Sequence, residues 1–148
     1  MSFTDDLNAE VVKILKEQWE IREGQKVPDT DDLKLANDGV KLTGTVLYAD
    51  LAESTQLVTK HDASFVAEIY KTYLNCACRI IRNQGGEITA FDGDRVMAVF
   101  LGDSKNSSAV RSALAINHAV VKIINPKIRE QYPSLSSDFQ VRQAVGID

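Results

Sequence analysis

The sequence predicts an α+β domain. Three observations lead to this prediction: four β-type runs, long helical patterns between them, and a hairpin signal that joins the middle two runs. Read in order along the chain, they give β-α-β-β-α-β after a lead helix. That order is the one found in a split βαβ, or ferredoxin-like, α/β sandwich.

Composition limits the function. A chain of 148 residues is long enough for one domain with its own core. Its formal net charge of −4 provides no basic field, so we expect no nucleic-acid polymer as a partner. Apolar runs fall short of the roughly 20 residues that span a bilayer, and the N-terminus is acidic, unlike a signal peptide. We therefore expect a cytoplasmic protein without membrane contact.

Residues 1–40 are expected to form a lead helix and a connecting segment. Apolar residues at helical spacing predict the helix over residues 5–20: Leu7, Val11, Val12, Leu15 and Trp19. The following stretch, REGQKVPDTDDLKLANDGVKL, is rich in Asp, Gly and Lys, and we expect it to lack regular structure. The core domain is then expected over 41–148.

The first core strand and the helices after it follow from residue type. TGTVLYADL is the opening strand, and Ser54 is expected to cap the helix that follows, because serine is a good N-cap. After a short loop at KHDAS, an amphipathic pattern predicts a helix over about 63–83. Gly85 suits the left-handed position just beyond that helix.

The second half of the core begins with a hairpin. EITAF and RVMAVF flank DGD, and Asp-Gly between two β-type runs is a strong hairpin signal. A helix from about 106 is expected to bend or break before Pro126, since proline disrupts a helix interior. DFQVRQAVGID is the last strand.

Two aspartates are expected to meet at one edge of this sheet. The first strand lies antiparallel to the third, so Asp50 at the end of the first comes close to Asp94 at the beginning of the third. Paired carboxylates are stable mainly around a divalent cation, and oxygen-only ligands suit Mg²⁺ or Mn²⁺. The alternative is that Asp50 caps a turn and Asp94 simply lies in the hairpin.

At these residues the chain resembles the class III nucleotidyl cyclases. LYADLAEST is similar to that family's first metal strand, FDGDRVMAVF to its second motif, and VGID to its next strand. The resemblance implies that Asp50, Asp94 and the Leu51 carbonyl hold two divalent cations, Mn²⁺ or Mg²⁺. It also implies that backbone groups of Ala52–Thr55, including Glu53, Ser54 and Thr55, meet the phosphates of a nucleoside triphosphate. No catalytic side chain beyond the metal ligands is implied.

A closer resemblance is to the pyrimidine cyclases of the bacterial Pycsar anti-phage systems. Ala90 stands where purine cyclases carry a base-reading lysine. The resemblance implies that Tyr48 and Arg95 contact the base of UTP, or of CTP, and that the product is cyclic UMP or cyclic CMP. The alternatives are that Tyr48 is a core or edge aromatic and that Arg95 is a solvated cation that balances the nearby aspartates.

The resemblance also implies parts that this sequence lacks. Class III domains continue beyond GID with an asparagine and an arginine that act across a homodimer interface. We therefore expect the 148 residues to be a fragment that is inactive by itself. An ordinary adenylate or guanylate cyclase, a catalytically dead module for nucleotide sensing or dimerisation, and a ferredoxin-like RNA binder are the alternatives.

Overall fold

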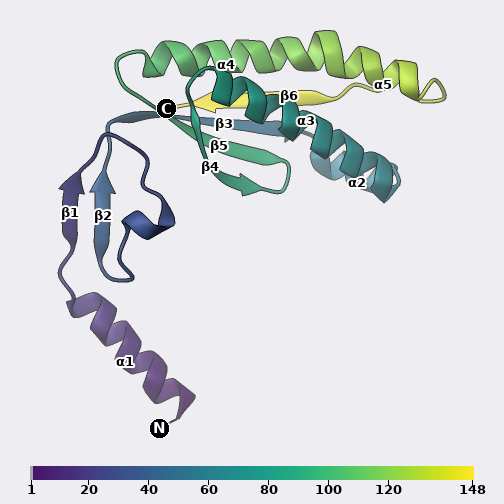
Figure 1. Cartoon of the computed structure of the whole chain (residues 1–148). Coiled ribbons are helices and arrows are strands. Elements are labelled where there is room, and N and C mark those ends of the chain that lie inside the picture. Colours follow the sequence, from purple (N-terminus) through teal and green to yellow (C-terminus); the bar gives the residue numbers. More distant parts are fainter. Residues whose placement is uncertain (1) are drawn as a thin grey trace. The chain divides into compact units, whose positions relative to one another are not determined.

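The computed structural model describes residues 2–148 and divides the chain into two compact units. The N-terminal unit ends at Thr43 and holds a helix and a two-stranded sheet, whereas the C-terminal unit, Gly44–Asp148, holds a four-stranded sheet with its helices (Figure 1). Within residues 2–148, no helix has both the length and the apolar character needed to cross a membrane.

Helix α1, Phe3–Lys16, is shorter than the sequence predicted. It ends before residue 20 because the backbone is already extended at Glu17. The Asn37 side-chain amide donates to the carbonyls of Ile14 and Glu17, at 2.9 and 2.7 Å, and so satisfies acceptors at the helix end. This contact joins residues about twenty positions apart, so local periodicity gives no sign of it.

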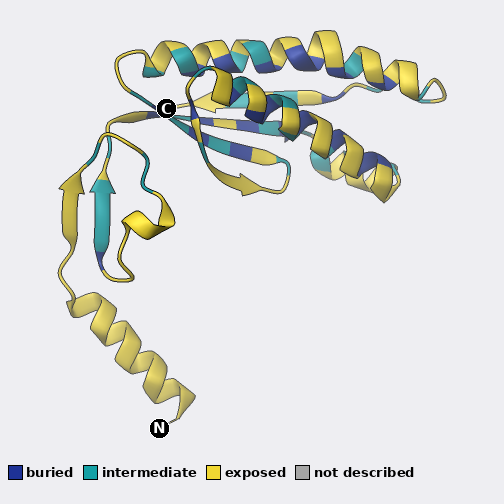
Figure 2. Ribbon diagram, in the orientation of Figure 1, coloured by how far each residue is buried: buried dark blue, intermediate teal, exposed yellow. Residues whose placement is uncertain are grey.

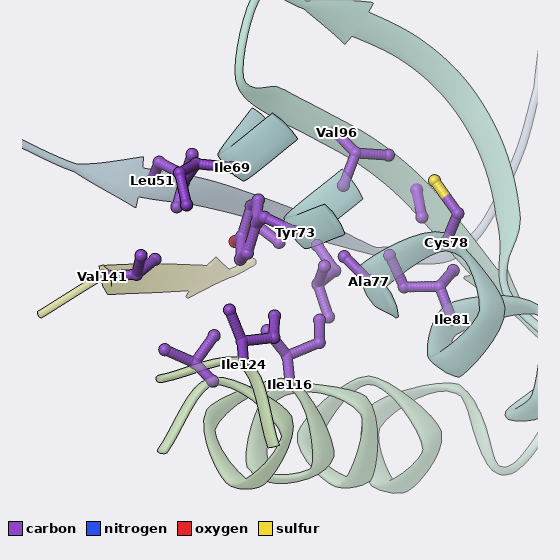
Figure 3. Close-up of a cluster of buried hydrophobic side chains, with 14 of the residues drawn as sticks. Leu51, Ile69, Tyr73, Ala77, Cys78, Ile81, Val96, Ile116, Ile124 and Val141 are labelled. Carbon is purple, nitrogen blue, oxygen red and sulfur yellow. The ribbon is translucent and has the colours of Figure 1, made fainter. Parts of the chain in front are cut away.

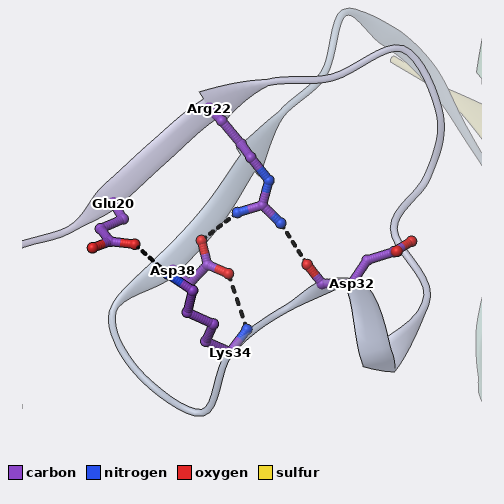
Figure 4. Close-up of polar contacts among 5 residues, drawn as sticks. All are labelled: Glu20, Arg22, Asp32, Lys34 and Asp38. Atoms are coloured by element: carbon purple, nitrogen blue, oxygen red, sulfur yellow. Dashed lines mark hydrogen bonds and ion pairs between the residues drawn. The ribbon is translucent and has the colours of Figure 1, made fainter.

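The segment that connects α1 to the core was expected to lack regular structure, and this expectation is wrong. It contains strand β1 (Glu20–Glu23), a 3-10 turn (Thr30–Asp32) and strand β2 (Asp38–Lys41), and the two strands pair in parallel. Figure 4 shows the polar contacts that hold it: Arg22 donates to the Asp38 carboxylate and to the Asp32 carbonyl. Lys34 donates its backbone N–H to Asp38 and its ammonium to Glu20. Strands this short depend on such contacts between distant residues, so their sequence alone does not mark them.

The C-terminal unit has the predicted fold. Its sheet has the order β4-β5-β3-β6 and every neighbouring pair is antiparallel, as in a ferredoxin-like core. Its strands are β3 (Gly44–Ala52), β4 (Glu87–Asp92), β5 (Arg95–Leu101) and β6 (Arg142–Ile147). The final strand begins four residues later than the run DFQVRQAVGID suggested.

Helices cover one face of this sheet (Figure 1). They are α2 (Ser54–Lys60), α3 (Ala63–Asn83), α4 (Lys105–Ala119) and α5 (Asn125–Gln131). Buried residues alternate along β3 and β5 (Figure 2). Among them, Leu47, Val96 and Phe100 are almost fully buried. Figure 3 shows how residues of α3, including Tyr73 and Ile81, pack against strand residues there.

The α-helix that leads to Pro126 is interrupted before it, as expected, although the chain stays helical. The five residues Val120–Ile124 form a π-helical turn that links α4 to α5. The Asn125 N–H donates to the Val120 carbonyl, five residues back. This wider turn lets the chain continue with Pro126 in the first turn of α5, where a proline lacking an N–H is tolerated.

Candidate functional site

The sheet has a second face that no helix of the C-terminal unit covers, and the proposed base-binding residues lie on it. Because side chains alternate along a strand, Tyr48 and Asp50 point away from the core that Leu47 and Ala49 enter. Tyr48 is 43% exposed and lies opposite Met97 of β5 and Gly146 of β6.

Arg95 reaches the same face and binds Asp50. The last paired residues of β3 and β5 are Ala49 and Val96, so the next residues along each strand are neighbours. The Nε–H and Nη2–H groups of Arg95 donate to Asp50 Oδ2 at 3.2 and 3.0 Å. These hydrogen bonds, and the charge of Asp50, raise the pKa of the Arg95 guanidinium. Without a ligand, Arg95 therefore acts as a cation that balances an aspartate, which was one of its two predicted roles.

Asp94 lies in the turn of the β4–β5 hairpin, one residue before β5 begins. The turn is of the two-residue kind, with Gly93 at a φ of 59° in the position where such turns require glycine. Asp94 Oδ2 is buried and finds no hydrogen-bond partner anywhere in residues 2–148. A buried carboxylate oxygen without a donor is the arrangement expected of a cation ligand, because a lone buried charge is costly.

Tyr73 of α3 is a residue that the sequence reading did not connect with the site. Its side chain is fully buried. Burial raises the pKa of its hydroxyl, and the nearby charges of Asp50 and Asp94 raise that pKa further. The hydroxyl therefore interacts electrostatically with both carboxylates. Its position within an apolar helical stripe marked Tyr73 only as a core residue.

The turn between β3 and α2 has an unusual backbone. Glu53 has a φ of 61°, the one positive φ at a non-glycine among residues 2–148. Glu53, not Ser54, precedes the helix as its N-cap, and Ser54 is the first helical residue, which corrects the expected cap. In this part of the chain no side chain caps α2. Left-handed residues other than glycine are strained and cluster at functional sites, so this turn is a candidate for ligand contact.

A cavity of about 190 Å³ opens beside this turn. Leu51, Glu53 and Ser54 line one side of it, and Lys60 and Arg142 contribute cations. Arg142 Nη1 lies 3.6 Å from Glu53 Oε1. The cavity does not include Asp50, Asp94 or Tyr48, and it is smaller than the roughly 300–1,000 Å³ typical of small-molecule sites. It therefore suits only a part of a nucleotide, such as a phosphate group.

Side chains alone would not enclose a metal ion here. Across residues 2–148 there is no group of three or more His, Cys, Asp or Glu side chains placed to hold one. Asp50 and Asp94 would have to share a cation with backbone oxygens, water or substrate. Mg²⁺ is commonly held in that way, through one or two carboxylates and the phosphates of the substrate, so the residues present fit such an ion.

The chain is similar to known proteins in both sequence and fold. No protein-family model matches the chain. Over its whole length the chain is 49% identical to a protein from Burkholderia cepacia and 46% identical to one from Xanthomonas perforans, both named uridylate cyclase. Over its whole length the chain is thus similar to proteins named uridylate cyclase. It spans less than two thirds of their length, 64% of each of these two. It is also 40% identical to a third protein of that name, from Rhodovulum, and spans 62% of its length.

Solved structures place the fold among cyclase domains. The adenylyl cyclase CyaB from P. aeruginosa matches with a TM-score of 0.57 and 26% identity, over 70% of this chain and 54% of that one. A bacterial light-regulated adenylyl cyclase matches with a TM-score of 0.54 and 22% identity, over 70% of this chain and 51% of its own. The resemblance to class III cyclases, and to the pyrimidine cyclases in particular, is thereby confirmed.

Proposed function

We propose that this chain is part of a metal-dependent nucleotide cyclase that converts UTP, or secondarily CTP, to the 3′,5′-cyclic monophosphate and pyrophosphate. The observation that carries the proposal is the whole-length similarity to proteins named uridylate cyclase. Support comes from the placement of Tyr48, Asp50 and Arg95 together on the face of the sheet without helices.

The carboxylates of Asp50 and Asp94, with the backbone carbonyl of Leu51, would hold two divalent cations, Mn²⁺ or Mg²⁺. Such cations lower the pKa of an attacking hydroxyl and neutralise charge on a phosphate leaving group. The buried, unpartnered Oδ2 of Asp94 supports this assignment. The end of β3 supports it as well. The last three residues of β3, Asp50–Ala52, extend beyond its pairing with β5, so their backbone groups on that side are not paired with β5.

Tyr48 and Arg95 are proposed to select the base. The ring of Tyr48 is half-exposed. A pyrimidine can stack on this ring or form a hydrogen bond with its hydroxyl. Arg95 uses two of its N–H groups on Asp50. A guanidinium has five N–H donors, so the remaining ones are free to donate to a pyrimidine carbonyl while the ion pair persists.

The turn at Glu53, Ser54 and Thr55 is proposed to hold the phosphates. The cavity beside it supports this, because Lys60 and Arg142 supply positive charge at its wall. The 3.6 Å contact between Arg142 and Glu53 is long and half-exposed, so it is weak and exchanges easily. Arg142 can therefore turn from Glu53 to a phosphate oxygen.

The active unit is proposed to be a homodimer with its sites at the interface. The helix-free sheet face supports this, because it leaves the Tyr48 side chain 43% exposed. The apolar residues of α1 add to it: no residue of Phe3–Lys16 is buried. We further propose that the cyclic nucleotide is made in the cytoplasm as a second messenger in antiviral defence, following the resemblance to the Pycsar cyclases.

The cation site is tested with the full-length protein by replacing each aspartate. Asp50→Asn and Asp94→Asn should each abolish Mn²⁺-dependent formation of cyclic UMP, measured by chromatography of the products. Asp92→Asn is the matched control, since Asp92 is an exposed carboxylate of the same hairpin that lies opposite Arg95. It should keep most of the activity. Full activity in both Asp50 and Asp94 variants would refute the proposal.

A further inference from the structure

The Tyr73 hydroxyl is a buried donor that has no acceptor. Tyr73 is 0% exposed, and its hydroxyl makes no hydrogen bond with any part of the chain that the structure describes. Burying a hydroxyl without a partner is unfavourable, and a phenylalanine would fill the same space without that penalty. In this state of the protein the hydroxyl destabilises the core, and an acceptor provided by another state would remove that cost.

The charges that act on the pKa of this hydroxyl are those of the two aspartates of the proposed cation site. In Figure 3 the oxygen of Tyr73 lies at the end of the ring on the side of Leu51 and Val141. Leu51 directly follows Asp50 in β3. The charges of Asp50 and Asp94 both raise the pKa of the Tyr73 hydroxyl, after burial as the larger cause, which is consistent with a location beside that edge of the sheet.

Of the two carboxylates, Asp94 is the one that lacks a donor. Asp50 Oδ2 already accepts two hydrogen bonds from Arg95. Asp94 Oδ2 is buried and, within residues 2–148, has no partner. An ionised carboxylate only accepts hydrogen bonds and a neutral tyrosine donates one. The unmatched donor and the unmatched acceptor are therefore complementary.

We propose that the Tyr73 hydroxyl donates a hydrogen bond to the Asp94 carboxylate when Asp94 binds a divalent cation. This makes Tyr73 a positioning residue: it fixes the carboxylate from the core side of the sheet and leaves the other lone pairs of Asp94 for the ion. The inference rests on the cation site of the proposed function. Hydrogen bonds from outside the ligand set orient metal ligands in this way, and their removal typically weakens metal binding about 10- to 100-fold.

The test compares Tyr73→Phe with Tyr70→Phe in the full-length protein. Tyr70 is a half-buried tyrosine of the same helix and serves as the control. The dissociation constant for Mn²⁺ is measured without nucleotide, from the electron paramagnetic resonance signal of the free ion. The urea midpoint of unfolding is measured in EDTA. We expect Tyr73→Phe to weaken Mn²⁺ binding about tenfold with an unchanged or higher midpoint, and Tyr70→Phe to leave Mn²⁺ binding unchanged.

Three results would overturn the inference. Two of them concern Tyr73 alone, and the third also refutes the proposed cation site. Equal Mn²⁺ affinity in wild type and Tyr73→Phe refutes the role of Tyr73 alone. A lower midpoint for Tyr73→Phe in EDTA does so too, because the hydroxyl would then have a structural partner in the metal-free protein. If wild type binds no Mn²⁺ that depends on Asp50 and Asp94, the cation site itself fails and the inference fails with it.

Discussion

Tyr48 is the residue whose replacement probes base recognition most cleanly. It lies on the helix-free face opposite Met97, and it is 43% exposed in the protein alone. Tyr48→Leu keeps an apolar contact with Met97 but removes the ring and its hydroxyl. Tyr48→Phe removes only the hydroxyl. Because the side chain is only half-buried, we expect Tyr48→Leu to lower the free energy of unfolding by about 1 kcal/mol.

The magnitude for binding follows from stacking. A base stacked on an aromatic side chain contributes about 1–3 kcal/mol. Since about 1.4 kcal/mol corresponds to a tenfold change, Tyr48→Leu should weaken UTP binding about 5- to 150-fold. Tyr48→Phe should lie near wild type if the ring stacks, and near Tyr48→Leu if the hydroxyl is the main contact. The two variants together thus separate packing from hydrogen bonding.

The assay is calorimetric titration of UTP into the full-length protein, with the Asp94→Asn change added to prevent turnover. Tyr70→Leu, which alters a half-buried tyrosine of α3, is the control for general loss of packing. If Tyr48→Leu binds UTP as tightly as its parent while remaining folded, Tyr48 does not contact the base. An equal loss in the Tyr70 control would attribute the effect to packing.

Three further predictions concern other parts of the C-terminal unit. Gly86→Ala should lower the free energy of unfolding by about 1–3 kcal/mol in urea, because its Cβ would lie 2.6 Å from Phe100 Cζ; Gly146→Ala, whose Cβ meets nothing within 4 Å, should not. Hydrogen bonds from the Ser64 hydroxyl and the Phe65 N–H lower the pKa of Asp62, so Asp62 stabilises α3 above the ordinary aspartate pKa of about 3.9 and loses that effect as the pH falls through its lowered value. Asp62→Ala should therefore be less stable than wild type at neutral pH, and the gap should close in acid; a constant gap would contradict this. Arg95→Met should tighten Mn²⁺ binding, by removing a cation paired with Asp50, and weaken UTP binding in calorimetry; weaker Mn²⁺ binding would show that Arg95 does not compete with the ion.

Most of the C-terminal fold could be predicted because its signals are local. Alternation in the β3 run and the helical stripe of α3 each identify an element by themselves, and Asp-Gly identifies the hairpin. The antiparallel neighbourhood of β3 and β5 then follows from topology. The N-terminal unit was predicted less well, because β1 and β2 are held by contacts such as Arg22 with Asp38, which lie 16 residues apart.

The site could be predicted at the level of strands but not of side-chain contacts. Sequence placed Asp50 beside the hairpin, and the register of β3 and β5 agrees. It left the direction of the Arg95 side chain open, and only the structure shows its ion pair with Asp50. The positive φ of Glu53 and the unpartnered hydroxyl of Tyr73 have no sequence signal at all, since both depend on tertiary surroundings.

The central claim is that the chain belongs to an enzyme that cyclises a pyrimidine nucleotide. Its most direct test incubates the full-length protein with UTP, CTP, ATP and GTP in equal amounts with Mn²⁺ and identifies the cyclic products by mass. We predict cyclic UMP as the main product, with cyclic CMP at most a minor one, and no product from the Asp50→Asn protein. Cyclic AMP or cyclic GMP as the main product, or undiminished product from Asp50→Asn, would contradict the account.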